Sequence, residues 1–136
     1  MTEEEAILFA NEAFYSAFAS RDVMAMDAVW AVEAPVVCVH PGGAPLTGRA
    51  AVMASWADIL RHQASAGMRF DGAQVHRIDG VALVTCFERM GSGALSATNG
   101  FVREGGRWRM VLHHAGACAD APRAPRTPAA DPGVLH

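Results

Sequence analysis

Residues 68–90, MRFDGAQVHRIDGVALVTCFERM, decide the fold, because two runs rich in β-branched and aromatic residues flank Asp79-Gly80. An Asp-Gly pair between two such runs is the strongest short-range signal for a two-residue hairpin turn. We therefore expect antiparallel strands over Met68–Ile78 and Val81–Met90.

The chain after this hairpin continues as strands. Gly91-Ser92-Gly93 precedes an expected strand over Ala94–Arg103, and Glu104-Gly105-Gly106 precedes another over Arg107–Ala115. Three-residue loops that contain glycine commonly join antiparallel neighbours. The second half of the chain is therefore predicted to be a mostly antiparallel sheet.

The residues before the hairpin are typical of helices. Thr2 and Glu5 form a capping box, and apolar residues then recur at helical spacing as far as Ser20. Two shorter helices are expected over residues 23–31 and from Thr47 to about Gly67, with a short β-branched strand between them. Residues that carry these predictions include the helix cap Asp22, the strand Val36–His40, and the stripe Val52, Trp56, Ile59 and Leu60. Three helices followed by an antiparallel sheet make an α+β fold.

Composition bounds the class of protein. The 136 residues are 51% hydrophobic and 18% charged, with a mean hydropathy of +0.15, which is enough for one domain with a full core and excludes a largely disordered chain. The net charge of −3 argues against partners such as nucleic acid or an anionic membrane. All eleven basic residues are Arg, so a Schiff-base or P-loop lysine is excluded.

Three further features concern location and domain limits. The cysteines Cys38, Cys86 and Cys118 lack CxxC spacing, and the acidic start of the chain differs from a signal peptide, so we expect a cytoplasmic protein. No apolar run reaches the roughly 18 residues that a membrane span needs. The domain is expected to cover residues 1–117, and the Pro- and Ala-rich residues 118–136 are expected to form a mobile tail.

Counting outward from the Asp79-Gly80 turn assigns residues to the two faces of the sheet. The turn places Gln74 opposite Thr85, and three-residue loops then place Asn99 beside Thr85. One face is expected to carry Gln74, His76, Leu83, Thr85, Phe87, Asn99, Phe101, Val111 and His113. The other face is expected to carry Val84, Cys86, Glu88, Ser96, Thr98, Trp108, Met110, Leu112 and His114. Both faces are largely apolar and three helices cover only one, so we expect a homodimer through the bare face.

Two segments, together with the order of the elements, carry a resemblance to a known family. His40–Arg49 reads HPGGAPLTGR, and Gly106–Gly116 reads GRWRMVLHHAG. In this order the chain resembles the nuclear transport factor 2-like (NTF2-like) superfamily, and within it the SnoaL-like group related to ketosteroid isomerases and polyketide cyclases. The resemblance implies a cone-shaped, cystatin-like fold, in which a curved sheet encloses a pocket against the long helix, and a dimer.

The resemblance also implies site residues. In ketosteroid isomerases the position of His40 holds an Asp that removes a proton next to a carbonyl, and a late Asp near the position of Asn99 helps to form an oxyanion hole. The tyrosines of that hole are matched by Phe14, Trp30 and Trp56, and Tyr15 lies one position away from the match. These departures argue against steroid isomerase activity.

The candidate catalytic residues are His40 as a base, with Asn99 or His113 as the partner that stabilises negative charge. Each has a structural alternative: a hydrogen bond within the Pro41–Gly43 loop, a bond to neighbouring backbone, or packing in the sheet. If the assignment of faces is reversed, Glu88, Ser96, Thr98 and His114 line the pocket, and a buried Glu88 becomes a rival acid or base. The expected pocket lining is Phe14, Tyr15, Trp30, Trp56, Thr85, Phe87, Phe101 and Val111.

Metal binding is not expected. His113 and His114 are adjacent on a strand and point to opposite faces, so they cannot ligate one ion together. A site built from His40, His113 and Cys38 or Glu88 is the remaining combination, but no pair shows the spacing of metal ligands.

These residues predict an enzyme without a cofactor that moves a proton on a small apolar or aromatic carbonyl compound, as an isomerase, cyclase or dehydratase. Two alternatives stay open: a binding protein without chemistry, or an assembly module, since the superfamily includes the association domain of a calmodulin-dependent kinase. An open cavity reached by His40 favours the enzyme, a wholly apolar lining favours the binding protein, and a filled cavity favours the assembly module.

Overall fold

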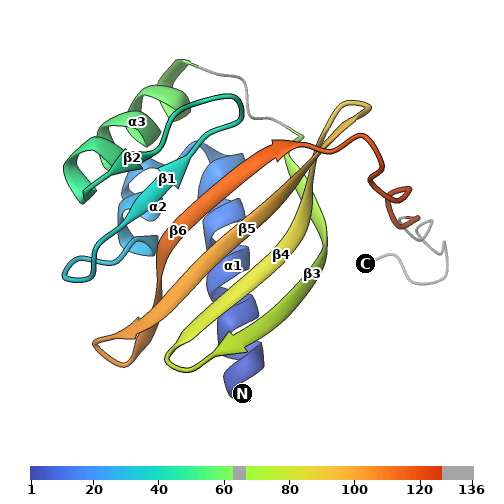
Figure 1. Cartoon of the computed structure of the whole chain (residues 1–136). Helices are drawn as coiled ribbons and strands as arrows, with labels where there is room; N and C mark the ends of the chain where they lie inside the picture. Colours follow the sequence, from blue (N-terminus) through green and yellow to red (C-terminus); the bar gives the residue numbers. More distant parts are fainter. Residues whose placement is uncertain (63–66, 127–136) are drawn as a thin grey trace, which may run out of the picture.

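The computed structural model describes residues 1–62 and 67–126 as three helices and one six-stranded sheet (Figure 1). The helices are α1 (Glu3–Ser20), α2 (Val23–Val29) and α3 (Arg49–His62). The strands are β1 (Val37–Val39), β2 (Leu46–Thr47), β3 (Arg69–Ile78), β4 (Val81–Met90), β5 (Gly93–Glu104) and β6 (Arg107–Ala117). The predicted α+β class is confirmed.

Capping residues set the ends of the first two helices. The Thr2 hydroxyl accepts a hydrogen bond from the backbone N–H of Glu5 at 3.0 Å, as the capping box predicts. Arg21 ends α1 in the left-handed conformation, with φ 56°. The Asp22 carboxylate then accepts from the backbone N–H of Ala25 at 3.0 Å and starts α2. The Arg-Asp pair therefore ends one helix and begins the next.

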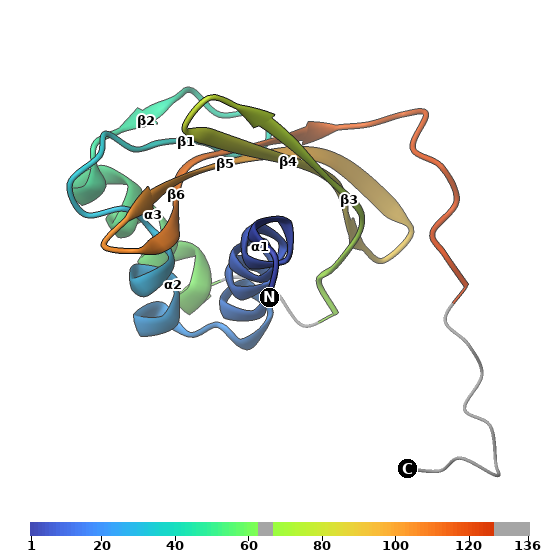
Figure 2. The same ribbon diagram turned by 90° about the horizontal axis from the view of Figure 1, so that it is seen from below.

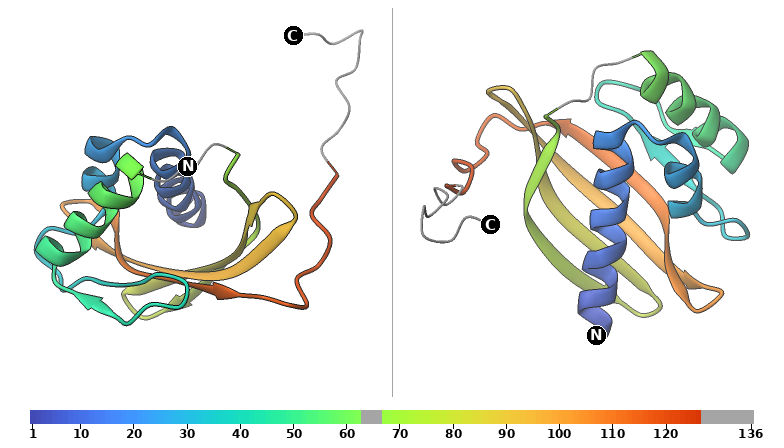
Figure 3. Two further views of the ribbon diagram at one scale, coloured as in Figure 1. Left: turned by 90° about the horizontal axis from the view of Figure 1, so that it is seen from above. Right: turned by 180° about the vertical axis from the view of Figure 1, so that it is seen from behind.

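The sheet has the strand order β2-β1-β6-β5-β4-β3, in which β3 to β6 are antiparallel neighbours and β1 runs parallel to β6. It curves around α1, and the helices lie on its concave side (Figure 2). The two views of Figure 3 show α3 beside the short strands β1 and β2, at the end of the sheet opposite β3. The cone that the resemblance implies is therefore present.

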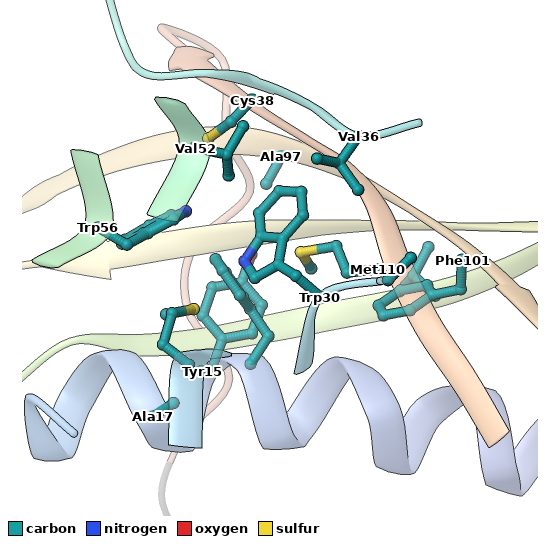
Figure 4. Packing of buried hydrophobic residues seen from close by; sticks show 14 of the residues in the cluster. Tyr15, Ala17, Trp30, Val36, Cys38, Val52, Trp56, Ala97, Phe101 and Met110 are labelled. Atoms are coloured by element: carbon teal, nitrogen blue, oxygen red, sulfur yellow. The ribbon is translucent and has the colours of Figure 1, made fainter. Parts of the chain in front are cut away.

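Apolar side chains fill most of the space between the helices and the concave face (Figure 4). Phe14 of α1, Trp30 after α2 and Trp56 of α3 are at most 1% exposed, and they belong to one core cluster with Phe101 and Met110 from the sheet. Burial of each such side chain stabilises the fold by about 1.5–3 kcal/mol. This core holds α1 in one position against the strands.

Two element boundaries differ from the prediction for an identifiable reason. Helix α2 ends at Val29 rather than Ala31, because Trp30 bridges to Met110 and the Ala31 N–H donates to the Met110 carbonyl at 2.9 Å. Thr47 belongs to β2, which pairs with β1, so α3 begins two residues later than expected. In both places a tertiary backbone pairing replaces a turn of helix.

The predicted register beyond β4 is wrong. The Asp79-Gly80 turn pairs Gln74 with Thr85 as predicted, but the next two turns contain two residues instead of three, so Met90 pairs with Gly93 and Glu104 pairs with Arg107. A shift of one residue exchanges the faces of a strand. As a result Asn99 pairs with Val84 rather than lying beside Thr85.

The shift reassigns the faces of β4 relative to β5 and β6. A bulge between Gly100 and Phe101 keeps Asn99 opposite His113, and both are buried on the concave face. That face also carries Val84, Cys86 and Glu88, whereas the alternating positions Thr85 and Phe87 point to the convex face. Ser96, Thr98 and His114 lie on the convex face as well. The expectation that Thr85 and Phe87 line a pocket beneath α1 is therefore corrected.

The residues after β6 are described as far as Arg126. The segment 118–126 forms neither helix nor strand, and residues 127–136 of the predicted tail lie outside the described residues. Within residues 1–62 and 67–126, no helix is long and apolar enough to cross a lipid bilayer.

Candidate functional site

A cavity of about 270 Å³ opens at one end of the cone, between the C-terminal half of α1, α3 and the concave face of the sheet. Most of its wall is apolar, and three polar side chains reach it: His40, Glu88 and His113. The apolar part consists of Phe18, Pro41, Trp56, Ile59, Met68, Met90 and Leu95. Three polar groups in an apolar wall are typical of a small-molecule site.

His40 follows β1, where the chain turns sharply. The Gly43 N–H donates to the His40 carbonyl at 2.8 Å, which fixes the backbone at the mouth of the cavity. The imidazole Nε2 lies 2.7 Å from Ser55 Oγ on α3, and the ring meets Trp56 edge-on at 5.1 Å. Burial lowers the pKa of His40, which favours the neutral ring.

His113 lies deeper, on β6, with 2% of its surface exposed. The rings of Phe14 and Trp56 flank it at 4.7 and 5.7 Å, and its Nδ1 lies 2.6 Å from Asn99 Oδ1. Burial, with smaller contributions from His40 and His114, lowers the pKa of His113 to about 3. This histidine is therefore a neutral polar group in the wall.

Asn99 connects His113 to α1. Its amide nitrogen donates to Asn11 Oδ1 at 2.8 Å and to the Tyr15 hydroxyl at 3.1 Å. Asn99 is fully buried and is not among the described residues that line the cavity. The expected role of the Asn99 amide as a donor to substrate is therefore corrected: both of its N–H groups are already used, and it lies one layer behind His113.

Glu88 completes the polar part of the cavity. Its Oε2 accepts a hydrogen bond from the Tyr15 hydroxyl at 2.7 Å and lies 3.8 Å from His113 Nε2. Burial raises the pKa of Glu88 and outweighs the opposite effect of the Tyr15 hydrogen bond. Burial also raises the pKa of Tyr15, so this hydroxyl remains a donor. The site thus combines an imidazole whose pKa burial lowers with a carboxyl group whose pKa burial raises.

Comparison with known proteins identifies the family. Residues 7–120 match the family described as the SnoaL-like domain. The chain belongs to the SnoaL-like domain family. The predicted membership of the NTF2-like superfamily is thereby confirmed. No curated protein matches the chain.

Solved structures show the same fold as this SnoaL-like domain. A candidate dehydratase of the NTF2-like family from Streptomyces avermitilis is 29% identical with a TM-score of 0.77, covering 84% of this chain and 94% of that chain. A candidate association domain of a calcium/calmodulin-dependent protein kinase type II from Thiobacillus denitrificans is 39% identical with a TM-score of 0.65, covering 80% and 92%. A protein with a cystatin-like fold from Caulobacter vibrioides, 16% identical with a TM-score of 0.73 over 86% and 90%, shows the fold alone.

The other predicted lining residues of the SnoaL-like domain have different positions. Trp56 lines the cavity, as expected. Phe14, Trp30 and Phe101 are fully buried in the core, and Tyr15 reaches the site only through Glu88 and Asn99. Val111 is half-buried at the bulge of β6, away from the described lining. The expectation that Phe14, Tyr15, Trp30, Phe101 and Val111 line the cavity is therefore corrected.

Several contributors to the site were not singled out in the sequence. Ser55 meets His40, and Asn11 meets Asn99, whereas Phe18, Ile59, Met68, Met90 and Leu95 form the apolar wall. Asn11 was visible in the sequence as a polar residue that interrupts the apolar stripe of α1 between Ile7 and Phe14. The structure shows that Asn11 is fully buried.

Two further observations on the structure concern metal ligands and other cavities. In the part of the chain that the structure describes, no group of three His, Cys, Asp or Glu side chains is arranged to hold a metal ion. A larger groove of about 680 Å³ lies between α1, α2 and the β5–β6 turn, past Phe9 and Trp108, but none of the candidate catalytic residues is among its described lining. The smaller cavity with His40 therefore remains the candidate site.

Proposed function

We propose that this SnoaL-like domain is a cofactor-independent enzyme that transfers a proton on a small, apolar carbonyl compound, as an isomerase, cyclase or dehydratase. The observation that carries the proposal is the placement of His40, a neutral imidazole anchored by Ser55 on the wall of an otherwise mainly apolar cavity. The likeness to a candidate dehydratase supports the same class of reaction.

The proposed reaction begins at His40. Its imidazole takes a proton from the carbon next to the substrate carbonyl, and the C–H electron pair forms a carbon–carbon double bond while the carbonyl oxygen gains negative charge. Glu88 in its protonated form donates a hydrogen bond or a proton to that oxygen, as a carboxylic acid in an apolar site does in ketosteroid isomerase. Glu88 thus replaces Asn99 as the stabilising partner.

The second half of the reaction sets the product. Return of the proton from His40 to a different carbon gives an isomer. If the substrate carries a hydroxyl group on the next carbon, the carbonyl re-forms instead, the electron pair of the new double bond shifts to that carbon, and the C–O bond breaks. The hydroxyl leaves as water with the proton that Glu88 supplies, and the proton held by His40 returns through water to Glu88. Water exclusion by the apolar wall strengthens both interactions.

Exchange of α-hydrogens for deuterium tests the proposal without knowledge of the natural substrate. Cyclohexanone is incubated with the protein in D₂O, and uptake of deuterium is followed by mass spectrometry. We expect the parent protein to exchange the α-hydrogens faster than buffer alone. In His40→Ala this added rate should fall by at least about tenfold, because general base catalysis contributes at least that much. The control His62→Ala changes an exposed histidine outside the cavity. Equal exchange in His40→Ala and the parent protein excludes His40 as the base.

The convex face of the sheet is a candidate surface for self-association of the chain. No helix among the described residues covers the convex face of the sheet, which carries the half-buried Leu83, Phe87, Val102 and Leu112 (Figure 2). This uncovered face mixes these apolar side chains with polar ones such as Thr85, Thr98 and His114, a composition found at many protein interfaces. We propose a homodimer through it, and the 39% identity to a candidate association domain supports assembly as a second role. The open cavity argues against assembly as the sole role.

A further inference from the structure

A chain of hydrogen bonds runs from α1 through Asn99 to the cavity, and it fixes the position of one hydrogen atom. The Asn99 amide nitrogen donates its two hydrogens to Asn11 Oδ1 and to the Tyr15 hydroxyl. The amide oxygen is therefore the end that faces His113, 2.6 Å from Nδ1. Because an amide oxygen only accepts hydrogen bonds, the hydrogen between these two atoms belongs to His113 Nδ1.

The other ring nitrogen of His113 then carries a lone pair. A neutral imidazole holds one hydrogen, and burial keeps this ring neutral. The Nε2 atom lies 3.8 Å from Glu88 Oε2, which is too far for a direct hydrogen bond. Within residues 1–62 and 67–126 no side chain donates to the lone pair of Nε2, and His113 belongs to the lining of the cavity.

The charges around the cavity restrict what it accepts. Among the described residues, the titratable groups near His113 in the cavity are His40 from the end of β1 and Glu88 from β4, while His114 points to the opposite face of β6. None of the described lining residues is Arg, and the sequence contains no Lys. An anionic ligand would thus enter an apolar space next to Glu88 without a cation to pair with it, at a high cost in desolvation.

We propose that the Asn11–Asn99–His113 chain makes the cavity a site for neutral ligands that bear a hydroxyl group, whose O–H donates to His113 Nε2. Asn99 is a positioning residue in this arrangement, since it acts through the ring of His113. The inference rests on the proposed function for the choice of this cavity, but it concerns binding rather than turnover. A volume of 270 Å³ is that of about nine water molecules, which suits a ligand with one or two rings.

The first test measures the tautomer of His113 directly. Uniformly ¹⁵N-labelled protein without ligand is studied at neutral pH by long-range ¹H–¹⁵N correlation NMR, and the signals are assigned with His113→Gln, which lacks them. We expect a protonated Nδ1 and an unprotonated Nε2. A hydrogen on Nε2 would overturn the inference, because it requires the Asn99 and Asn11 amides to be reversed and the Tyr15 hydroxyl to turn from Glu88 to Asn99.

The second test compares three ligands of nearly equal shape: 4-methylphenol, which donates a hydrogen bond, 4-methylanisole, which only accepts one, and the anion 4-methylbenzoate. Dissociation constants come from NMR titration. We expect the phenol to bind about tenfold more tightly than the anisole, because one hydrogen bond to a buried acceptor changes the affinity by about that factor. The benzoate should bind most weakly. Equal affinity of phenol and anisole, or tighter binding of benzoate, contradicts the proposal.

A variant assigns the selectivity to Asn99. Asn99→Leu removes the acceptor at His113 Nδ1, so the preference for the phenol is expected to fall by several-fold and the tautomer signals to change, whereas His62→Ala keeps both. If Asn99→Leu does not fold, the tautomer and ligand series of the parent protein still decide the question. Absence of deuterium exchange in cyclohexanone with the predicted tautomer and selectivity would refute the proposed reaction and leave this inference standing.

Discussion

Acid should destabilise this protein through His113, and His113→Gln should remove that part of the sensitivity. The unfolded chain protonates this ring below its ordinary pKa of 6.5, whereas the buried ring in the folded protein stays neutral down to about pH 3. The stability contributed by the neutral ring is complete above pH 6.5 and is lost progressively as the pH falls. Each pH unit in this window costs about 1.4 kcal/mol, so the loss from pH 7.5 to pH 5 is about 2 kcal/mol.

Urea denaturation followed by tryptophan fluorescence measures this effect. Because Glu88 and His40 also have shifted pKa values, the informative quantity is the difference between the parent protein and His113→Gln in their change of unfolding free energy from pH 7.5 to pH 5. We expect a difference of about 2 kcal/mol. Ile7→Val, a fully buried position on α1, should cost the usual 0.5–1.5 kcal/mol roughly equally at both pH values. Identical pH dependence in His113→Gln and the parent protein would refute the reasoning.

Three further predictions concern other contacts. Tyr15→Phe removes the hydroxyl between Glu88 and Asn99 and should lower the unfolding free energy by about 1–3 kcal/mol. The loss should be greater at pH 8 than at pH 4, because the hydrogen bond from the hydroxyl favours the Glu88 carboxylate, and equal losses at both pH values would contradict this. Glu104→Gln weakens three hydrogen bonds from backbone N–H groups that hold the pKa of Glu104 below its usual value. The melting temperature of the variant should therefore fall at pH 7 and approach that of the parent protein at pH 3, and an equal fall at both pH values would contradict this. Leu83→Arg on the convex face should convert the proposed dimer to a monomer in light scattering, and a monomeric parent protein disproves the dimer.

Local signals were sufficient for the elements of the fold. The Asp79-Gly80 turn fixed the pairing of Gln74–Ile78 with Val81–Thr85, because only a short, well-defined turn was consistent with those residues. The caps of α1 and α2 were equally local, since Thr2 and Asp22 each bond to a backbone N–H three residues later. Structure that depends on a few neighbouring residues can be read from the sequence.

The faces of the sheet could not be read in the same way. Glycines on both sides of Ser92, and the pair Gly105-Gly106, permit turns of either two or three residues, and one residue of difference exchanges a face. A bulge at Gly100 then adjusts the pairing again, with no signal beyond the glycine. For this reason Glu88 was a conditional alternative in the sequence, whereas the structure places it in the cavity.

The site was predicted only where a motif marked it. His40 stood out because it begins the His-Pro-Gly-Gly segment. The Asn99 contact with Asn11 joins residues that are 88 positions apart, and Ser55 reaches His40 from a separate helix. Such contacts depend on how α1 and α3 settle against the sheet, which no local pattern specifies.

The central claim is that a small ligand occupies the cavity bounded by His40, Glu88 and His113. Intermolecular NMR contacts between 4-methylphenol and the labelled protein test it most directly. The account predicts contacts from the ligand to Trp56 and Met68 in the wall of that cavity. Contacts confined to Phe9 and Trp108 in the groove between α1, α2 and the β5–β6 turn would contradict it.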